Sequence, residues 1–382
     1  MHVLFTALSA HGHIYPLLPL ARAVAARGDR VTFVTGADFH PLLTKLGFDT
    51  VEAGLGMHEA FGQAIEALGA PVDFRDPDDP NKDRAVARVF GTVQPRAFLA
   101  ALDPVFERDR PDLVVYEVAN PGAAIAARRR GIPAVSHGIA RGDITGIFPE
   151  FDRLLTEVAA EHGVDISADP LMLADPYLDV YPASLQEHQH PSRVPLRPVA
   201  FADPGELPAW VAAHEQPLVY LTLGTAFGTA EVLRVAIDGL ADLPVRVLVA
   251  AGPQVDADEL RGVPDSVTVL PWVPQADLLP HADLVVHHGG SGTTLGSLAQ
   301  GLPQLFLPQG ADQFINADTI TAAGIGRTLR GAEATSAAIG AAAAELLADD
   351  GARTAARAVA DEIAAMPGPD EVAASLRNLP TS

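Results

Sequence analysis

Two histidines followed by glycines and hydroxyl residues form the stretch of the sequence best suited to bind an anion. The stretch HHGGSGTT begins at residue 287 and directly follows the apolar run 283–286. Glycine lets a backbone approach a ligand closely, and the N–H groups at a helix start attract negative charge. A tight strand–helix turn is the purely structural alternative. We expect a phosphate site, made by His287, Gly289, Gly290, Ser291, Gly292 and Thr293, with Thr225 of the loop LTLGTAFG as a smaller second part.

A general base is the chemistry predicted for the stretch SAHGHIYP, near the N-terminus. His13 falls in the first turn of an expected helix, where the helix dipole disfavours a charged imidazole. A neutral histidine accepts a proton, and an anionic partner orients its ring. Glu117 ends the apolar run 111–117 and would reach the same sheet edge. We expect His13 and Glu117 to act together. His11 is the rival base, and a helix cap beside a solvated strand end is the structural alternative.

Two further stretches carry side chains that suit a nucleotide and a sugar. Trp272 lies between prolines in PWVPQADLL (271–279), where an indole ring would stack on a flat base. A core tryptophan is an equally good interpretation. Asp312 and Gln313 follow an apolar run in PQGADQFINA and suit vicinal hydroxyls, although a helix N-cap explains an isolated Asp-Gln pair better.

These residues must be positioned by strands and helices that alternate along the chain. Continuous valine and leucine runs suit strands covered on both faces by helices, and the intervening stretches 17–28 and 122–131 have helical spacing. The fold class predicted is α/β, with two doubly wound domains in tandem that face each other across a cleft. Strands are expected at 2–8, 30–36, 111–117, 132–138, 217–224, 245–252, 283–289 and 302–308.

The proline-rich stretch around residues 195–215 separates the two repeats of this alternation. Residues 56–100 and 141–195 escape the pattern, and long excursions of this kind often carry recognition. We predict a first domain at 1–200, a linker at 201–215, a second domain at 216–360 and a helical tail at 361–382 that packs back toward the first domain.

Composition excludes several classes of protein and of site. The chain has 382 residues, no cysteine and a formal charge of −22. Disulfides, thiolate metal sites and nucleic acid as main partner are therefore not expected. No apolar run is long enough to span a membrane, and the start does not look like a signal peptide, so a cytoplasmic location is predicted. A homodimer is left open.

Taken together, WVPQ, HHGGSGT and ADQFINA resemble the family 1 glycosyltransferases of the GT-B fold, with two Rossmann-like domains, and especially the actinobacterial branch that decorates natural products. The resemblance covers essentially the whole chain, and it implies that the first domain binds an acceptor and the second a donor. It implies inverting transfer of a sugar from a nucleotide donor to an acceptor hydroxyl, without a metal. His13 would be the base and Glu117 its partner, although most family members carry aspartate there.

The resemblance also assigns roles in donor binding. His287 would bind the diphosphate together with Thr293 and Thr225. Trp272 would stack on the base, with the Val273 backbone at the base edge, and Asp312 and Gln313 would hold the sugar.

One departure from the family pattern concerns the donor. Relatives that use UDP-sugars often carry a glutamate for the ribose hydroxyls where this chain has Leu295. An unpaired hydroxyl against leucine costs about 1–3 kcal/mol, which favours a dTDP-activated, deoxygenated sugar.

The acceptor is expected to be a large apolar aglycone, bound by Phe61, Phe90, Phe148 and Phe151 unless these rings are core. The alternatives in function are a nucleotide-sugar 2-epimerase and a non-catalytic accessory protein that binds a sugar nucleotide or an aglycone.

Overall fold

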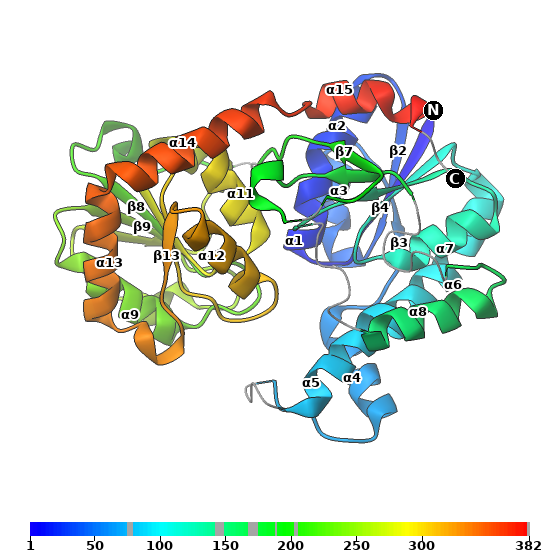
Figure 1. The fold of residues 1–382 in the computed structure, drawn as a ribbon, viewed down its shortest axis with the longest axis horizontal. Coiled ribbons are helices and arrows are strands. Elements are labelled where there is room, and N and C mark those ends of the chain that lie inside the picture. Colours follow the sequence, from blue (N-terminus) through cyan, green and yellow to red (C-terminus); the bar gives the residue numbers. More distant parts are fainter. Residues whose placement is uncertain (75–78, 142–148, 167–174, 188, 202–204, 380–382) are drawn as a thin grey trace. The chain divides into compact units, whose positions relative to one another are not determined.

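The computed structural model describes residues 1–74, 79–141, 149–166, 175–187, 189–201 and 205–379. This part of the chain forms two compact units, each with its own parallel sheet (Figure 1). Two parallel sheets confirm the predicted α/β class. Unit 1 comprises Met1–Val180, Gln186–Leu196 and Pro367–Ser382, and unit 2 comprises Tyr181–Leu185 and Arg197–Met366.

Unit 1 is built on a seven-stranded sheet with the order β3-β2-β1-β4-β5-β6-β7, in which all neighbouring strands are parallel. Its central strands are buried along nearly their whole length, as the continuous apolar runs predict. The strands are β1 (His2–Thr6), β2 (Arg30–Thr35), β3 (Asp49–Glu52), β4 (Leu113–Glu117), β5 (Ala134–His137), β6 (Tyr177–Asp179) and β7 (Arg193–Pro195).

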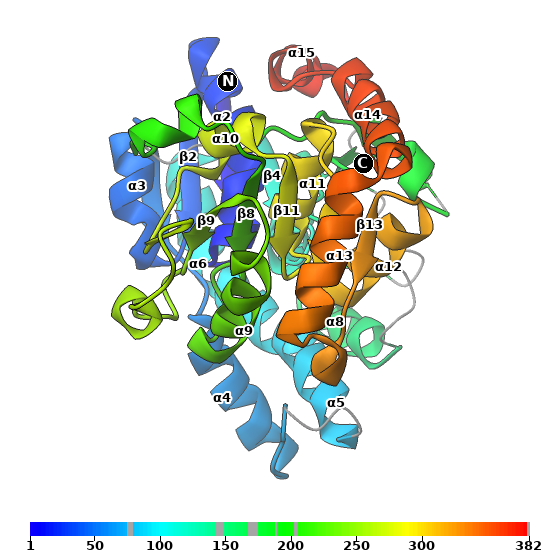
Figure 2. The same cartoon turned by 90° about the vertical axis from the view of Figure 1, so that its left-hand side faces the viewer.

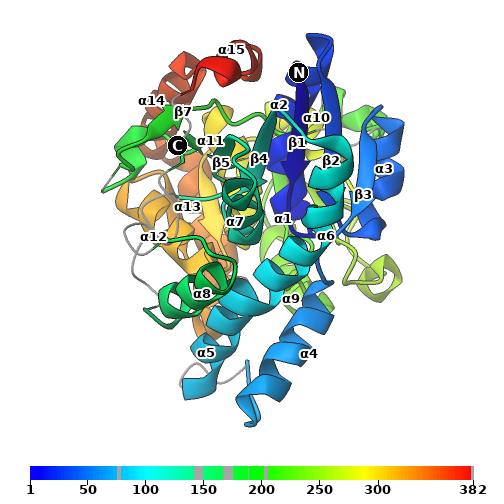
Figure 3. The same ribbon diagram turned by 90° about the vertical axis from the view of Figure 1, so that its right-hand side faces the viewer.

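Helices connect and cover these strands, and α6 and α7 pack together over one face of the sheet (Figure 3). The C-terminal helix α15 packs on α2 in the same unit. The helices are α1 (His11–Ile14), α2 (Leu18–Ala26), α3 (His40–Lys45), α4 (Met57–Leu68), α5 (Pro80–Arg88), α6 (Gln94–Asp109), α7 (Pro121–Arg129), α8 (Pro149–Glu161) and α15 (Pro369–Ser375), with shorter turns η1 (Tyr15–Leu17), η2 (Ala37–Phe39), η3 (Val89–Val93) and η9 (Leu376–Asn378).

Unit 2 repeats the architecture with a six-stranded parallel sheet of order β10-β9-β8-β11-β12-β13. Helices α9 and α13 lie side by side over one face (Figure 2). The strands are β8 (Leu218–Thr222), β9 (Arg246–Ala250), β10 (Val267–Leu270), β11 (Leu284–His287), β12 (Gln304–Phe306) and β13 (Gly326–Thr328); the helices are α9 (Ala230–Ala241), α10 (Gln275–Leu278), α11 (Ser291–Ala299), α12 (Gln313–Ala322), α13 (Ser336–Ala348) and α14 (Asp350–Ala365); the turns are η4 (Ala183–Leu185), η5 (Ala209–Ala213), η6 (Ala257–Leu260), η7 (Leu279–His281) and η8 (Gly331–Glu333).

The stretch 56–100, which escapes the strand–helix alternation, is largely helical where it is described. Asp79 caps α5 by accepting a hydrogen bond from the Asn81 amide, and Gly69 ends α4 with a positive φ of 66°. Both are the residue types that such positions favour. These helices lie between β3 and β4 in sequence, so they insert a helical layer beside the sheet edge where unit 1 would bind a ligand.

Candidate functional site

The predicted histidine–carboxylate pair forms in unit 1. The Nδ1 atom of His13 lies 2.9 Å from Oε1 of Glu117. His13 sits in α1, directly after β1, and Glu117 is the last residue of the neighbouring strand β4. Parallel neighbours end at the same sheet edge, which is why residues 104 positions apart meet. A carboxylate only accepts hydrogen bonds, so Nδ1 carries the hydrogen and Nε2 is the basic ring atom.

The Glu117 carboxylate is fully buried, whereas the His13 side chain is 22% exposed. Backbone N–H groups satisfy the rest of the carboxylate: Ala119 donates to Oε1 at 2.8 Å and Leu8 to Oε2 at 3.4 Å. A buried charge is tolerated only when it is paired and hydrogen-bonded. The arrangement therefore holds a negative charge against one side of a solvent-reachable imidazole, as a general base requires.

His11, the rival base, has a different environment. Its ring packs edge-on against Tyr15 and Phe39, with centroid distances of 5.2 and 4.9 Å. Glu117 pairs with His13 and not with this ring. The geometry therefore favours His13 for proton transfer.

Four polar side chains beside the pair were missed by the sequence reasoning. Ser9 Oγ, Thr35 Oγ1, Asn120 Oδ1 and His137 Nε2 are buried and lack a hydrogen-bond partner within the described protein. They end or follow β1, β2, β4 and β5, so they gather along one sheet edge. Unsatisfied buried groups of this kind often mark where a ligand or water binds. The sequence signal that could have identified these residues is a polar side chain at or just after the end of each apolar run.

His137 is the most constrained of these groups. It pairs in register with Glu117, and its Nδ1 bonds the Gly138 carbonyl at 2.7 Å. Burial lowers the pKa of His137 to about 4, although the nearby Glu117 carboxylate opposes part of that shift. The ring is therefore neutral at pH 7 and does not compete with His13 as a cation for the carboxylate.

In unit 2, the first histidine of HHGGSGTT is a core residue. His287 is fully buried at the end of β11. Its Nε2 pairs with Gln304 Oε1 at 2.9 Å, and its Nδ1 accepts the Gly289 amide at 3.2 Å. Both ring nitrogens are thus used within the protein, and burial lowers the pKa of His287 to about 3. This geometry does not present His287 to a phosphate, because successive strand residues alternate between faces and this one points inward.

His288 packs instead between Gly224 and Gly290, and its ring donates a hydrogen bond to the Thr222 backbone. The ring is only partly buried, and its Nδ1 is shielded and has no hydrogen-bond partner in the described protein. A Cβ on Gly224 or Gly290 would come within 2.5 and 2.4 Å of ring atoms, so both positions require glycine. Burial lowers the pKa of His288 to about 4, which keeps it neutral at pH 7.

The hydroxyl groups of the turn bond the protein rather than facing a ligand. Ser291 Oγ donates to Asp312 Oδ2 at 2.8 Å, and Thr293 Oγ1 to Gln275 Oε1 at 3.1 Å. Thr294 Oγ1 donates to the Gly290 carbonyl at 3.0 Å. The hydroxyls therefore stabilise the start of α11. The groups that could bind an anion are the first backbone N–H groups of that helix, because no carbonyl of a preceding helical turn accepts their hydrogen bonds.

Gly289 and Gly292 fill different roles in the turn. Gly289 has a φ of 97°, and a Cβ there would lie 2.8 Å from the Gln313 carbonyl oxygen. At Gly292 a Cβ would meet nothing within 4 Å, and the residue is exposed. Gly289 therefore allows the sharp turn, while Gly292 places no side chain over the N-terminus of α11.

The predicted base-binding residues lie on the loop after β10. Trp272 is 40% exposed, which is unusual for so large a ring and is suited to stacking. Val273 is buried in a small cluster with Val211 and Leu278. Thr225 is partly buried in the turn after β8, beside the left-handed Gly224 with a φ of 74°.

Asp312 and Gln313 are partly engaged in holding their own loop. Asp312 Oδ2 accepts hydrogen bonds from Ser291 Oγ and from Asn316 Nδ2, the latter at 3.0 Å. Gln313 is 3% exposed, and its Oε1 accepts the amides of Gln309 and Gly310 at 2.7 and 3.1 Å. Asn316 also donates to the Gly289 carbonyl, so it links α12 to the turn before α11. Sequence reasoning did not select Asn316.

The remaining predicted residues have mixed environments. Leu295 is 5% exposed on α11. Phe61 is partly buried and meets the Phe74 ring edge-on at 5.2 Å, and Phe90 is partly buried between two clusters of unit 1. Phe151 is 9% exposed and belongs to the core, which is the alternative considered for these rings. Phe148 lies outside the described residues.

The described residues contain neither a candidate membrane-spanning helix nor a candidate metal cluster. No helix in the ranges that the structure describes is both long and apolar enough to cross a membrane. In those same ranges, no cluster of three or more histidine, aspartate or glutamate side chains is arranged to hold a metal ion.

Comparisons with known proteins extend over the whole chain. Family models match for the N-terminal domain of erythromycin biosynthesis protein CIII-like proteins over residues 22–224 and for their C-terminal domain over residues 234–379. The L-demethylnoviosyl transferase of Streptomyces niveus is 33% identical over 387 residues, covering 98% of this chain and 97% of that protein. The elloramycin glycosyltransferase ElmGT of Streptomyces olivaceus is 33% identical over 405 residues, covering 100% and 99%.

A solved structure shows the same fold. The glycosyltransferase SsfS6 of Streptomyces sp. SF2575, complexed with thymidine diphosphate, has a TM-score of 0.82 and 26% identity, and 99% of each chain is covered. The GT-B fold predicted from the sequence is therefore confirmed.

Proposed function

The chain belongs to the erythromycin biosynthesis protein CIII-like glycosyltransferases, which use nucleotide sugars, and we propose that it transfers a deoxysugar from a dTDP-sugar to a hydroxyl of a large apolar natural-product aglycone, with inversion at the anomeric carbon. The observation that carries this proposal is the 2.9 Å pair between His13 Nδ1 and Glu117 Oε1.

The proposed step is a single displacement. His13 Nε2 takes the proton of the acceptor hydroxyl while that oxygen bonds the anomeric carbon. The bond from that carbon to the diphosphate oxygen breaks on the opposite face, so the configuration inverts. Glu117 stabilises the imidazolium that forms, because its buried carboxylate already accepts the Nδ1–H.

We propose that the diphosphate binds at the start of α11 in unit 2. The N–H groups of Ser291, Gly292 and Thr293 occupy the first turn, where the helix dipole favours an anion. His288 packs against Gly224, and therefore beside Thr225, and its one ring N–H is donated to the Thr222 backbone, so the donors to the diphosphate are the backbone N–H groups. Neutral donors of this kind stabilise a leaving diphosphate without a metal.

Two observations support dTDP as the carrier of the sugar. The similar protein SsfS6 was crystallised with thymidine diphosphate. In this chain the buried Leu295 stands where a ribose-binding glutamate would serve a UDP-sugar. Under this proposal Trp272 stacks on the thymine, the Val273 backbone lies at its edge, and Asp312 and Gln313 hold the sugar.

The acceptor class follows from the named relatives and from unit 1. The two curated relatives are a demethylnoviosyl transferase and an elloramycin glycosyltransferase. Phe61 and Phe90 offer partly buried rings on the helical layer between β3 and β4. We propose that an apolar aglycone packs there, with its hydroxyl toward His13.

The test separates the base from the donor site. We expect His13→Ala to lower the rate of transfer from a dTDP-sugar about 10²–10⁴-fold while the Kd of dTDP changes less than about twofold. His11→Ala is the matched control and should keep most of the activity. The measurements are product formation by mass spectrometry over an aglycone panel and dTDP titration by calorimetry. Unchanged turnover in His13→Ala would remove this residue from the mechanism.

The same experiments address the alternatives. Donor incubated alone would yield an epimerised sugar if the chain were a 2-epimerase. Tight binding of dTDP and of an aglycone without any product would indicate an accessory binding protein.

A further inference from the structure

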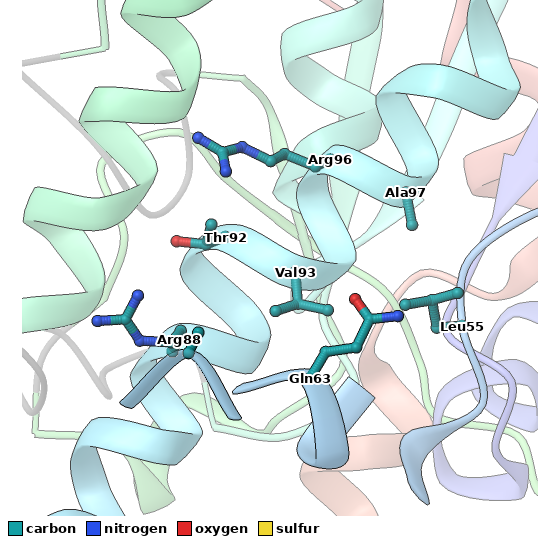
Figure 4. A pocket seen from close by; sticks show the side chains of 8 residues that line it. Leu55, Gln63, Arg88, Thr92, Val93, Arg96 and Ala97 are labelled. Atoms are coloured by element: carbon teal, nitrogen blue, oxygen red, sulfur yellow. The ribbon is translucent and has the colours of Figure 1, made fainter. Parts of the chain in front are cut away.

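A pocket of about 480 Å³ lies inside the helical layer of unit 1, apart from the residues assigned above. It is lined by side chains from the loop after β3, from α4, from the end of α5, from η3 and from α6 (Figure 4). Its volume lies in the range that small-molecule sites occupy. The lining residues are Leu55, Gln63, Ala67, Arg88, Thr92, Val93, Arg96 and Ala97.

The lining has two sides of different chemistry. Arg88, Thr92 and Arg96 extend their polar ends on one side, whereas Leu55 and Ala97 lie on the other together with the Gln63 amide (Figure 4). A ligand that matches this lining has an apolar body and a polar end.

The polar side contains two groups without partners. Arg88 Nε and Thr92 Oγ1 are both buried and make no hydrogen bond within the described protein. Leaving such groups unpaired costs about 1–3 kcal/mol each, more when the group is charged, so they mark a place that a ligand or water completes. The guanidinium needs an acceptor, and a hydroxyl can donate to the same one.

Charge indicates which acceptor fits. The chain carries a formal charge of −22, yet two arginines and no carboxylate line this pocket. Arg96 is already paired with Glu161, with N–O distances of 2.6 and 2.9 Å. Among the described residues Arg88 makes no ion pair, so its positive charge is available to an anion. A planar carboxylate matches a guanidinium group best.

The backbone that carries these groups contains a π-helical turn, which is rare in proteins. Residues Val89–Val93 form a π-helical turn, closed by a bond from the Gln94 amide to the Val89 carbonyl. Pro95 follows and has no N–H to donate to the carbonyl four residues earlier, so a regular α-turn cannot form there. Such turns are frequent at functional sites, and this one sets Arg88 and Thr92 on the same side of the pocket.

We propose that this pocket binds a carboxylate on an aromatic acceptor, with Arg88 and Thr92 holding the carboxylate and Leu55, Val93 and Ala97 contacting the ring. That the ligand is the acceptor rests on the function proposed above. Leu55 follows β3, which ends at the same edge of the parallel sheet at which Glu117 ends β4.

The test uses two probes with the same ring and hydroxyl, 6-hydroxy-2-naphthoic acid and its methyl ester, in which a methyl group replaces the charge of the carboxylate. We expect the full-length protein to bind the acid about 10- to 100-fold more tightly than the ester, as hydrogen bonds to a charged group allow. Arg88→Gln should reduce this preference to less than about threefold, with little change in the Kd of the ester. Affinity is measured by the fluorescence of the naphthalene ring.

Arg84→Gln is the matched control, because Arg84 lies one turn earlier on α5, pairs with Glu150 and does not line the pocket. It should keep the full preference for the acid. Equal affinity of the wild-type protein for the two probes, binding of neither probe, or an unchanged preference in Arg88→Gln would overturn the proposal.

The variant Thr92→Val tests whether the Thr92 hydroxyl binds the ligand or stabilises the fold. Because Thr92 Oγ1 makes no hydrogen bond to any residue that the structure describes, the variant should melt no lower than wild type while its affinity for the acid falls about three- to tenfold. A lower melting temperature with unchanged affinity would show that the hydroxyl serves the fold, and would contradict the proposal.

Binding and transfer are measured separately so that the two proposals can fail separately. Glycosylation of the ester, in a protein that does not distinguish acid from ester, would leave the glycosyltransferase proposal standing and remove this one. Selective binding of the acid, with no transfer to either probe or to any aglycone, would support a carboxylate site in this pocket and contradict the proposed transfer reaction.

Discussion

Each unit has a histidine motif at or just after the end of a strand, and the two units use it differently. In unit 1, His13 lies in the short helix after β1, is 22% exposed and bonds a buried carboxylate. In unit 2, His287 is still part of β11, is fully buried and bonds Gln304. The difference is one of position: the first side chain has left the strand, whereas the second remains in its alternating pattern and points into the core.

The two units also differ in the charge of the groups that they place at these strand ends. Unit 1 keeps a full negative charge, on Glu117, beside the ring that would take a proton. Unit 2 offers neutral rings and the backbone N–H groups of α11, because burial keeps the pKa values of His287 and His288 at about 3 and 4. A base needs a partner for the cation it becomes, whereas a site for an anionic leaving group needs only fixed donors.

The largest effect in this comparison is expected at the buried carboxylate. Glu117→Gln should lower the rate of transfer about 100-fold without changing the Kd of dTDP, because a neutral amide does not stabilise the His13 imidazolium. Glu117→Asp should recover part of the rate, limited by the missing methylene. The measurement is turnover at saturating donor, with thermal melting as a check on folding. A Gln variant that kept more than a tenth of the rate would show that the charge is dispensable.

A smaller effect should separate the two adjacent histidines of unit 2. His288→Ala should weaken dTDP about tenfold, because the ring packs against Gly224 and Gly290 and supports the turn whose backbone N–H groups would bind the diphosphate. His287→Asn should leave the Kd of dTDP within about twofold but lower the free energy of unfolding by about 1–3 kcal/mol, because Gln304 loses its partner in the core. Calorimetric titration and urea unfolding distinguish the two. The reverse pattern would return the phosphate role to His287.

The smallest effect concerns the pH dependence of stability. The folded pKa of His287 is about 3 and that of His137 about 4, below the usual 6.5 of an unfolded histidine. The unfolded chain therefore binds more protons as the pH falls below 6.5, so the free energy of unfolding decreases on acidification and does so until the folded pKa is reached. Each histidine should contribute a loss of about 1 kcal/mol between pH 7 and 5.5.

This prediction is measured as a slope, from urea unfolding at several pH values. His287→Gln should remove one histidine's share of the loss, while His11→Ala, whose ring lies outside the core contacts of His287, should not. Equal slopes in wild type and His287→Gln would mean that His287 is not buried as a neutral ring.

Much of the fold was predictable because its signals are local. Apolar runs such as 2–8 and 217–224 became β1 and β8, and Gly28 ended the first long helix with a φ of 84°. Short strands such as β6 and β13 were not predicted, since three residues carry too little pattern. The pocket at Arg88 had no signal either, because nothing in the order of residues shows that Pro95 converts one turn into a π-helix.

The sequence by itself determined the α/β class, the family and the pairing of His13 with Glu117, because these depend on runs, motifs and the common edge at which parallel strands end. Only the tertiary structure decided that His287 is fully buried and His288 partly buried, that the hydroxyls of Ser291 and Thr293 bond the protein, and that Arg88 Nε makes no hydrogen bond within the described residues. The reason is physical: residue type states what a group can bond, whereas burial and packing decide whether the protein has already bonded it.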